Sequence, residues 1–115
     1  MKRGRGGVEY DDLKVGDGPS ADRGVKVDIR YNLYLNRGQL IQENQECSFR
    51  IGKRRVIPGL EYGVEGMRVG GERRLRVAPH LAYRDRAIPG RIPANAVLEF
   101  HVTLLNVQAL HDSDA

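Results

Sequence analysis

Apolar and polar residues alternate most regularly between residues 25 and 35. The apolar positions of this stretch are Val25, Val27, Ile29, Tyr31, Leu33 and Leu35. Successive side chains of a β-strand point to opposite faces of a sheet, so this period of two predicts a half-buried antiparallel strand. We therefore expect Tyr31 to point into the protein interior.

The same alternation recurs over shorter lengths in three later stretches, residues 47–51, 72–78 and 97–107. The pattern places Cys47 and Phe100 on the apolar faces of the first and the last of these stretches, so both side chains are expected to point inward. A catalytic thiol needs an activating base or a helix N-terminus, and no histidine lies near Cys47 in the sequence. We interpret Cys47 as a packing residue.

Two further stretches have weaker patterns. Residues 7–16 form a candidate first strand before a turn-rich segment. Residues 36–38 predict a turn, after which the chain runs back through a short apolar segment at residues 40–41. Residues 42–46 predict a polar loop. The chain as a whole is therefore predicted to be mostly antiparallel β-structure.

Residues 56–70 predict one short helix between two turns. Pro58 suits the first helical position, and Glu61 lies near the positive N-terminal end. The apolar positions with the spacing of one helical face are Leu60, Val64 and Met67. Each glycine inside a helix costs about 1 kcal/mol relative to alanine, so this glycine-containing helix must be held by packing. A sheet wrapped round the helix in two layers would supply that packing.

A long connection runs from residue 80 to residue 96. It exceeds an ordinary hairpin loop in length, and long loops in compact domains usually carry function. Its apolar or conformationally stiff residues are Tyr83, Ile88, Pro89, Ile92 and Pro93. Because it lies on this loop, Tyr83 is a candidate functional residue.

Composition narrows the class of protein. The chain has 115 residues, of which 40% are hydrophobic and 30% charged, and these values fit one globular domain. No apolar run is long enough to cross a bilayer, and the basic start is not followed by the apolar segment of a secretory leader. Cys47 is the only cysteine, so it cannot form an internal disulfide. We expect a soluble, cytoplasmic protein.

Basic residues are concentrated in the middle of the chain. The net charge is +4, and residues 50–76 contain eight basic residues against three acidic ones. This balance is compatible with an anionic partner, but no nucleic-acid-binding motif accompanies it. We interpret the charge as a solvated surface and do not expect nucleic acid to be a partner.

Five motifs occur in order within residues 56–107. They are a Val-Ile-Xaa-Gly helix entrance, a Met-Xaa-Val-Gly exit, an Ala-Tyr loop, an Ile-Pro-Gly-Xaa-Ile-Pro run and a last strand that contains Phe. With these motifs the chain resembles the FKBP-type peptidyl-prolyl isomerases, the macrolide-binding immunophilins, and the similarity extends over residues 7–107. The resemblance implies an α+β, mostly β fold, in which a twisted antiparallel sheet of about five strands curls round one short α-helix. The expected domain is residues 7–108, with flexible tails at 1–6 and 109–115.

The resemblance also implies a proline-binding pocket at the entrance to the helix. The expected catalytic residues are Tyr31, Ile57, Tyr83 and Phe100. The expected substrate-binding residues are Ile41, Gln42, Cys47, Val56, Leu60, Ile88 and Ile92. The Ile57 N–H and the Tyr83 hydroxyl would donate hydrogen bonds to carbonyls beside the substrate proline. From the alternation alone, Tyr31 and Phe100 are core aromatics.

Four positions depart from the family pattern. The family commonly has Phe and then Asp where this chain has Ile41 and Gln42, a second Phe where it has Cys47, and often His where it has Ile88. These differences predict a less aromatic pocket and reduced activity. Because the family's macrolide ligands use the carboxylate that Gln42 replaces, we expect weakened macrolide affinity.

The resemblance implies an enzyme that accelerates Xaa–Pro bond rotation in unfolded or flexible protein segments and so assists folding. Rotation about an amide C–N bond requires no nucleophile, and the three histidines are scattered, so we expect no metal and no cofactor. We also expect a monomer that does not bind membranes. The alternative is a non-catalytic module of the same fold that holds a protein or nucleic-acid partner through its altered pocket or basic surface.

Overall fold

The computed structural model of the chain describes residues 2–36, 38–81 and 95–108. Its elements in chain order are β1 (Lys2–Arg3), a 3-10 turn η1 (Arg5–Gly7), β2 (Glu9–Lys14), β3 (Lys26–Leu35), β4 (Leu40–Arg50), α1 (Pro58–Val64), β5 (Glu72–Val77), a 3-10 turn η2 (Pro79–Leu81) and β6 (Leu98–Gln108). The strands form one six-stranded antiparallel sheet in the order β1-β2-β5-β6-β3-β4. The predicted mostly β fold with one short helix is confirmed.

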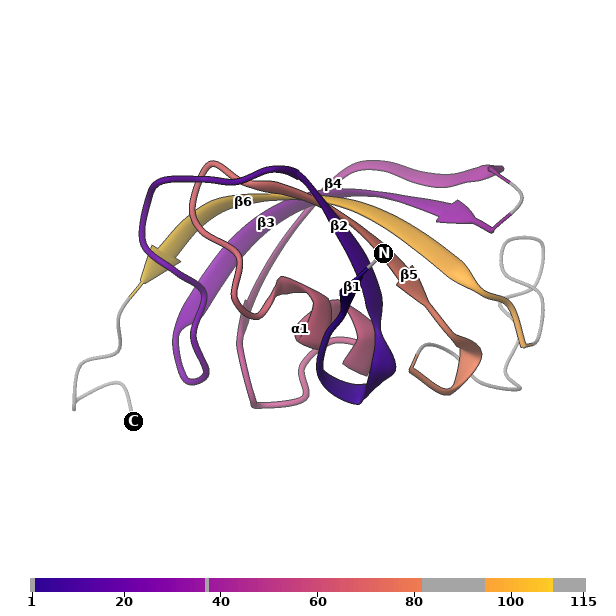
Figure 1. Cartoon of the computed structure of the whole chain (residues 1–115), viewed down its shortest axis with the longest axis horizontal. Helices are drawn as coiled ribbons and strands as arrows, with labels where there is room; N and C mark the ends of the chain where they lie inside the picture. Colours follow the sequence, from indigo (N-terminus) through magenta and orange to yellow (C-terminus); the bar gives the residue numbers. More distant parts are fainter. Residues whose placement is uncertain (1, 37, 82–94, 109–115) are drawn as a thin grey trace.

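The sheet curls over α1, which lies on its concave side (Figure 1). The apolar residues of the sheet and of the helix form one core between these two layers. Burial of the alternate strand residues drives this packing, since an amphipathic sheet must cover its apolar face. The fully buried side chains are Phe100, Ile29, Leu33, Ile51, Leu75, Leu98, Leu104, Val8, Val27, Val64, Val77 and Val102.

Strand β3 shows the predicted alternation and pairs with both β4 and β6. Val27, Ile29 and Leu33 are buried, whereas Tyr31 on the same face is only half-buried. A side chain on the core face keeps solvent exposure only where the core is open, so Tyr31 marks an opening between the sheet and the helix.

Two glycines allow α1 to lie close to β5. An added Cβ at Gly63 would lie 2.4 Å from Leu75 Cδ1, and one at Gly59 would lie 2.2 Å from Val77 Cγ1. Both distances are far below van der Waals contact. Glycine at these positions lowers the helix propensity relative to alanine, but it allows the helix to pack closely against the sheet.

Strand β4 is one continuous strand, so the prediction of a polar loop at residues 42–46 is wrong. The chain passes through this segment with a bulge, where Asn44 has φ 51° and its N–H donates to Asn32 Oδ1 at 2.7 Å. β4 lies at the edge of the sheet, and edge strands carry polar residues on both faces and bulges without ceasing to pair. The polar residues at 42–46 therefore pointed to a loop, although they belong to an edge strand.

The N-terminal residues extend the sheet. Residues 7–16 contain β2, as predicted, and within the expected tail at 1–6 the short strand β1 pairs with β2 and is the sixth strand. The expected tail at 109–115 lies outside the described residues. Among the described residues, no helix is both long and apolar enough to span a membrane.

Candidate active site

A cavity of about 450 Å³ opens between the concave face of the sheet and the start of α1. Its lining residues are Tyr31, Leu33, Gln42, Cys47, Arg54, Arg55, Val56, Ile57, Leu60 and Phe100. They come from β3, β4, β6, α1 and the link between β4 and α1. The cavity is thus assembled from the sheet and the helix together, and neither element could form it alone.

The inner end of the cavity is apolar and rigidly packed. Leu60 from the first turn of α1, Leu33 from β3 and Phe100 from β6 are all buried in the core. The Tyr31 ring meets the Phe100 ring edge to face, with the centroids 5.5 Å apart and the planes at 60°. This geometry is a preferred one for aromatic pairs, and it fixes both rings against the cavity.

The helix entrance supplies a backbone donor. Pro58 occupies the first position of α1, and the Ile57 carbonyl accepts hydrogen bonds from the N–H groups of Leu60 and Glu61 at 3.1 and 3.3 Å. In the described part of the chain, the Ile57 N–H itself has no hydrogen-bond acceptor. Because Ile57 lines the cavity, this N–H can serve a carbonyl bound there.

One wall of the cavity is polar. The Tyr31 hydroxyl donates a hydrogen bond to Gln42 Oε1 at 3.3 Å. Gln42 lies opposite Leu33 in the β3–β4 ladder, so the bulge in β4 turns its amide toward the cavity. The neutral amide can accept from Tyr31 while it brings no charge to the site.

Cys47 lies on the same strand and lines the cavity without being fully buried. Desolvation by its apolar surroundings raises the pKa of the thiol above its ordinary value. The thiol therefore stays protonated near neutral pH, which fits the interpretation of Cys47 as a packing residue rather than a nucleophile.

The link between β4 and α1 is anchored by a buried carboxylate. Glu61 is only 5% exposed, and its Oε1 accepts hydrogen bonds from the N–H groups of Gly52 and Arg54 at 3.0 and 3.2 Å. Arg54 has φ 55°, an unusual conformation for a residue other than glycine. The Glu61 side chain holds this conformation, and so it positions Arg54 and Arg55 at the cavity.

Seven of the predicted site residues line the cavity. They are Tyr31, Gln42, Cys47, Val56, Ile57, Leu60 and Phe100. Ile41 is half-buried and packs against the core, but it is not among the lining residues in the described part of the chain. Tyr83, Ile88 and Ile92 lie outside the described residues, and the roles assigned to all these residues remain predictions.

Three lining residues were not predicted. Leu33 could have been found, because it shares the apolar face of β3 with Tyr31. Arg54 and Arg55 directly precede Val56 in the sequence, yet their polar character pointed to a solvated link. Among the described residues, no group of three or more His, Cys, Asp or Glu side chains could hold a metal ion.

The sequence motifs and this geometry agree with a comparison against known families. A family model described as FKBP-type peptidyl-prolyl cis-trans isomerase matches residues 18–105. The chain belongs to this family. The match includes β3, β4, α1 and β5 and most of β6, and therefore every element that lines the cavity.

Known family members are similar over most of the chain. An FK506-binding protein 4 from Neurospora crassa is 48% identical over 105 residues, which cover 89% of this chain and 22% of that protein. A protein of Saccharomyces cerevisiae named peptidyl-prolyl cis-trans isomerase is 42% identical over 106 residues, which cover 90% of this chain and 26% of that protein. The chain thus spans about a quarter of these relatives.

A solved structure has the same fold. The crystal structure of AtFKBP13 has a TM-score of 0.82 to this chain and 30% sequence identity, and the match covers 92% of this chain and 97% of that one. The sheet curled round a single short helix is therefore the fold of the family.

Proposed function

We propose that this chain is a peptidyl-prolyl cis–trans isomerase that accelerates rotation about Xaa–Pro bonds in protein substrates. The observation that carries the proposal is the cavity of about 450 Å³, which has an apolar inner end. It is lined by Ile57, whose N–H has no acceptor among the described residues. A proline ring is a compact apolar group, and the pocket has room for it and for the flanking backbone. Membership of the family supports the same activity.

The reaction requires binding rather than covalent chemistry. Amide resonance makes the barrier to rotation about 18–20 kcal/mol, and no bond has to break for the isomers to exchange. The planar amide carries more charge separation than the twisted transition state. The apolar surfaces of Phe100, Leu60 and Val56 offer the bound amide a less polar surrounding than water, and this favours the twisted state over the planar one.

The polar groups of the pocket orient the substrate. The Ile57 N–H can hold a carbonyl beside the proline, and this contact fixes one end of the rotating bond. We expect the Tyr83 hydroxyl to hold another carbonyl, although that residue lies outside the described part of the chain. Spontaneous Xaa–Pro exchange takes tens to hundreds of seconds, so even modest acceleration would speed the folding of a client protein.

Weak macrolide binding is part of the proposal. Relatives of this chain are named FK506-binding proteins. Gln42 lines the cavity where the family commonly has aspartate, so this chain offers an amide in place of a carboxylate. We expect Gln42→Asp to bind FK506 more tightly than the wild type in a calorimetric titration, and equal affinities would contradict this role of the position.

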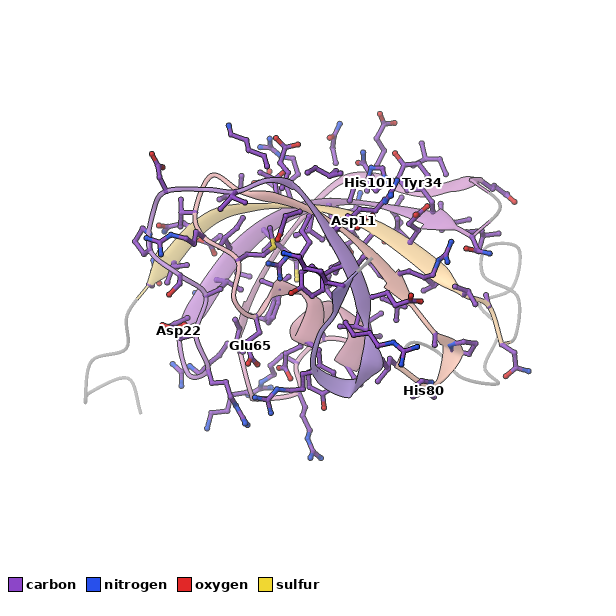
Figure 2. The ribbon with its side chains drawn as sticks, in the orientation of Figure 1. Asp11, Asp22, Tyr34, Glu65, His80 and His101 are labelled. Carbon is purple, nitrogen blue, oxygen red and sulfur yellow. The ribbon has the colours of Figure 1, made fainter. Side chains whose placement is uncertain are left out.

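The isomerase proposal is tested by NMR exchange spectroscopy on a short Xaa–Pro peptide. Tyr31→Phe, Phe100→Leu and Tyr83→Phe each change a pocket residue, and each is first checked for folding by circular dichroism. Tyr34→Phe is the matched control for Tyr31→Phe, because the Tyr34 ring contacts His101 on the convex side of the sheet, away from the cavity (Figure 2). We expect acceleration that falls in the pocket variants and not in the control. Absence of acceleration by the folded wild type would overturn the proposal.

The second candidate is a binding module that uses the basic segment to hold nucleic acid. The structure gives one observation against it, because Arg73 and Arg74 are paired with Asp12 and Asp11 of β2 at 2.7 and 2.8 Å. Part of the local positive charge is thus neutralised within the sheet. Salt-dependent binding of RNA or DNA by the folded protein would favour this candidate.

A further inference from the structure

Within the described residues, the lining of the cavity carries two positive charges and no carboxylate. Arg54 and Arg55 are the only charged residues among the described residues that line it, and no carboxylate lies beside them in that lining. Both side chains are exposed, and neither makes an ion pair with a described residue. Gln42, which lines the cavity from β4, is neutral.

Other arginines of this chain are used differently. Arg73 is buried and bonds to Asp12 and to the Gly63 carbonyl, and Arg74 bonds to Asp11. These guanidinium groups fasten β2, β5 and α1 to one another. Within the part of the chain that the structure describes, the guanidinium groups of Arg54 and Arg55 make no such contacts, so they can meet a ligand.

The backbone that carries the two arginines is fixed. Glu61, buried at the start of α1, accepts hydrogen bonds from the N–H groups of Gly52 and Arg54. Val56 and Ile57 follow at once and line the same cavity. A peptide held by the Ile57 N–H would therefore place residues next to its proline within reach of Arg54 and Arg55.

We propose that Arg54 and Arg55 are specificity-determining residues, which select Xaa–Pro segments that carry an anionic side chain next to or near the proline. The inference rests on the isomerase function proposed above and names its substrate class. A guanidinium group binds carboxylate or phosphate oxygens through paired hydrogen bonds, so the shared chemistry is an acidic residue or a phosphorylated serine or threonine. Two cations, with no carboxylate beside them in the described lining, favour such a group over a neutral or basic one.

The test uses peptides that differ in one residue. The residue before proline is Glu, Gln, Lys or phosphoserine in an otherwise identical blocked peptide, and a second set places the same residues after proline. For each peptide, NMR gives the exchange rate and, from chemical-shift titration, the dissociation constant. Glu and Gln have nearly the same shape. The ratio of the exchange rates, or of the dissociation constants, of these two peptides therefore reports the effect of the charge alone.

We expect the wild type to favour the Glu peptide over the Gln peptide by about five-fold, the size expected of an exposed charge pair. The Lys peptide should be the poorest. Arg54→Gln with Arg55→Gln should bring the Glu to Gln ratio close to one. Lys53→Gln is the matched control, because Lys53 is exposed on the same link and does not line the cavity, and it should keep the wild-type ratio.

Two further measurements, at varied ionic strength and with the phosphoserine peptide, test the electrostatic origin of the preference and the kind of anion. Raising the ionic strength from about 0.01 M to about 1 M shortens the Debye length from about 30 Å to about 3 Å, so the preference for Glu should shrink. A phosphoserine peptide that outperforms the Glu peptide would identify phosphate as the source of the anion, and the reverse order would identify carboxylate.

The outcomes separate this inference from the isomerase proposal. Exchange that is accelerated equally for the Glu and Gln peptides overturns the selectivity and leaves the isomerase intact. No acceleration of any peptide overturns the isomerase, and the ratio of dissociation constants then still decides the role of the arginines. Loss of RNA binding in the double variant, with no difference between peptides, would assign the arginines to nucleic acid and overturn the inference.

Discussion

At the scale of single residues, Cys47 links burial to reactivity. Its thiol lines the cavity, and desolvation raises its pKa, so little thiolate exists near neutral pH. We predict that iodoacetamide alkylates the folded protein at about pH 7.5 more slowly than the urea-unfolded protein, because the thiolate is the reacting species. A bound Xaa–Pro peptide should slow the reaction further. Mass spectrometry measures both rates, and equal rates for the folded and unfolded protein would contradict the prediction.

Glu61 is a second residue whose role depends on its surroundings. Its carboxylate accepts two backbone N–H groups from the link before α1. Hydrogen bonds to a charged group are worth about 1.5–3 kcal/mol, so we predict that Glu61→Ala lowers the free energy of unfolding by about 2 kcal/mol or more. Chemical denaturation measures the change. Glu61→Gln keeps an acceptor oxygen, so its free energy of unfolding should fall by less. An equal decrease in both variants would show that the hydrogen bonds accepted by this oxygen do not stabilise the protein.

The sequence could predict residues on a regular face but not contacts across the fold. Tyr31, Cys47 and Phe100 follow from the alternation of their strands, and the structure places all three at the cavity. The contact of Glu61 with Gly52 does not follow from any period, because it joins a helix to a link whose path only tertiary packing sets. The helix dipole accounts for a carboxylate in the first turn, but it does not predict that the carboxylate is buried.

At the scale of elements, the close approach of α1 and β5 depends on Gly63. A methyl group there would lie 2.4 Å from Leu75 Cδ1, and Leu75 is fully buried. We predict that Gly63→Ala destabilises the protein by about 1–3 kcal/mol, although alanine favours helix by about 1 kcal/mol. Thermal unfolding followed by circular dichroism measures the loss.

A second substitution tests whether Gly63→Ala destabilises the protein through a steric clash with Leu75. Leu75→Val shortens the side chain that the new methyl group would meet, so Gly63→Ala should be less harmful in that background than in the wild type. The coupling free energy of the double-mutant cycle gives the answer. Additive effects would mean that the helix is displaced by something other than Leu75.

Strand β4 shows where pattern reading fails for an element. Its central residues are polar and exposed because it lies at the sheet edge, so neither alternation nor apolar content indicates a strand. The bulge at Asn44 also shifts the register, which moves Gln42 toward the cavity. Short helix α1, by contrast, was predictable, because Pro58 and the spacing of Leu60 and Val64 are local signals.

At the scale of the whole molecule, one buried arginine joins three elements. Arg73 of β5 is 7% exposed, bonds to Asp12 of β2 at 2.7 Å and donates to the Gly63 carbonyl of α1 at 3.0 Å. Its guanidinium also lies 4.2 Å from the centroid of the Tyr10 ring. Such a cation is tolerated in the interior because its donors are satisfied on several sides. The outer strands thus depend on the same layer of contacts that holds the helix beneath the cavity.

The attachment of β2 to β5 should make stability fall in acid. The hydrogen bond from Arg74 holds the pKa of Asp11 below its ordinary value, and the nearby positive charge acts in the same direction. A carboxyl group with a lowered folded-state pKa contributes stability above its unfolded-state pKa, and this contribution is lost as the pH falls through the lowered value. We predict that the difference in melting temperature between pH 6 and about pH 3 is smaller in Asp11→Asn than in the wild type.

A control variant separates this pair from the general effect of acid. Asp17 is exposed and makes no ion pair with a described residue, so Asp17→Asn should keep the full wild-type decrease in melting temperature. Arg74→Gln should reproduce the smaller decrease, since it removes the partner that lowers the pKa of Asp11. An unchanged decrease in Asp11→Asn would mean that acid acts through other carboxylates, and that β2 is held to β5 chiefly by its backbone ladder and by Arg73.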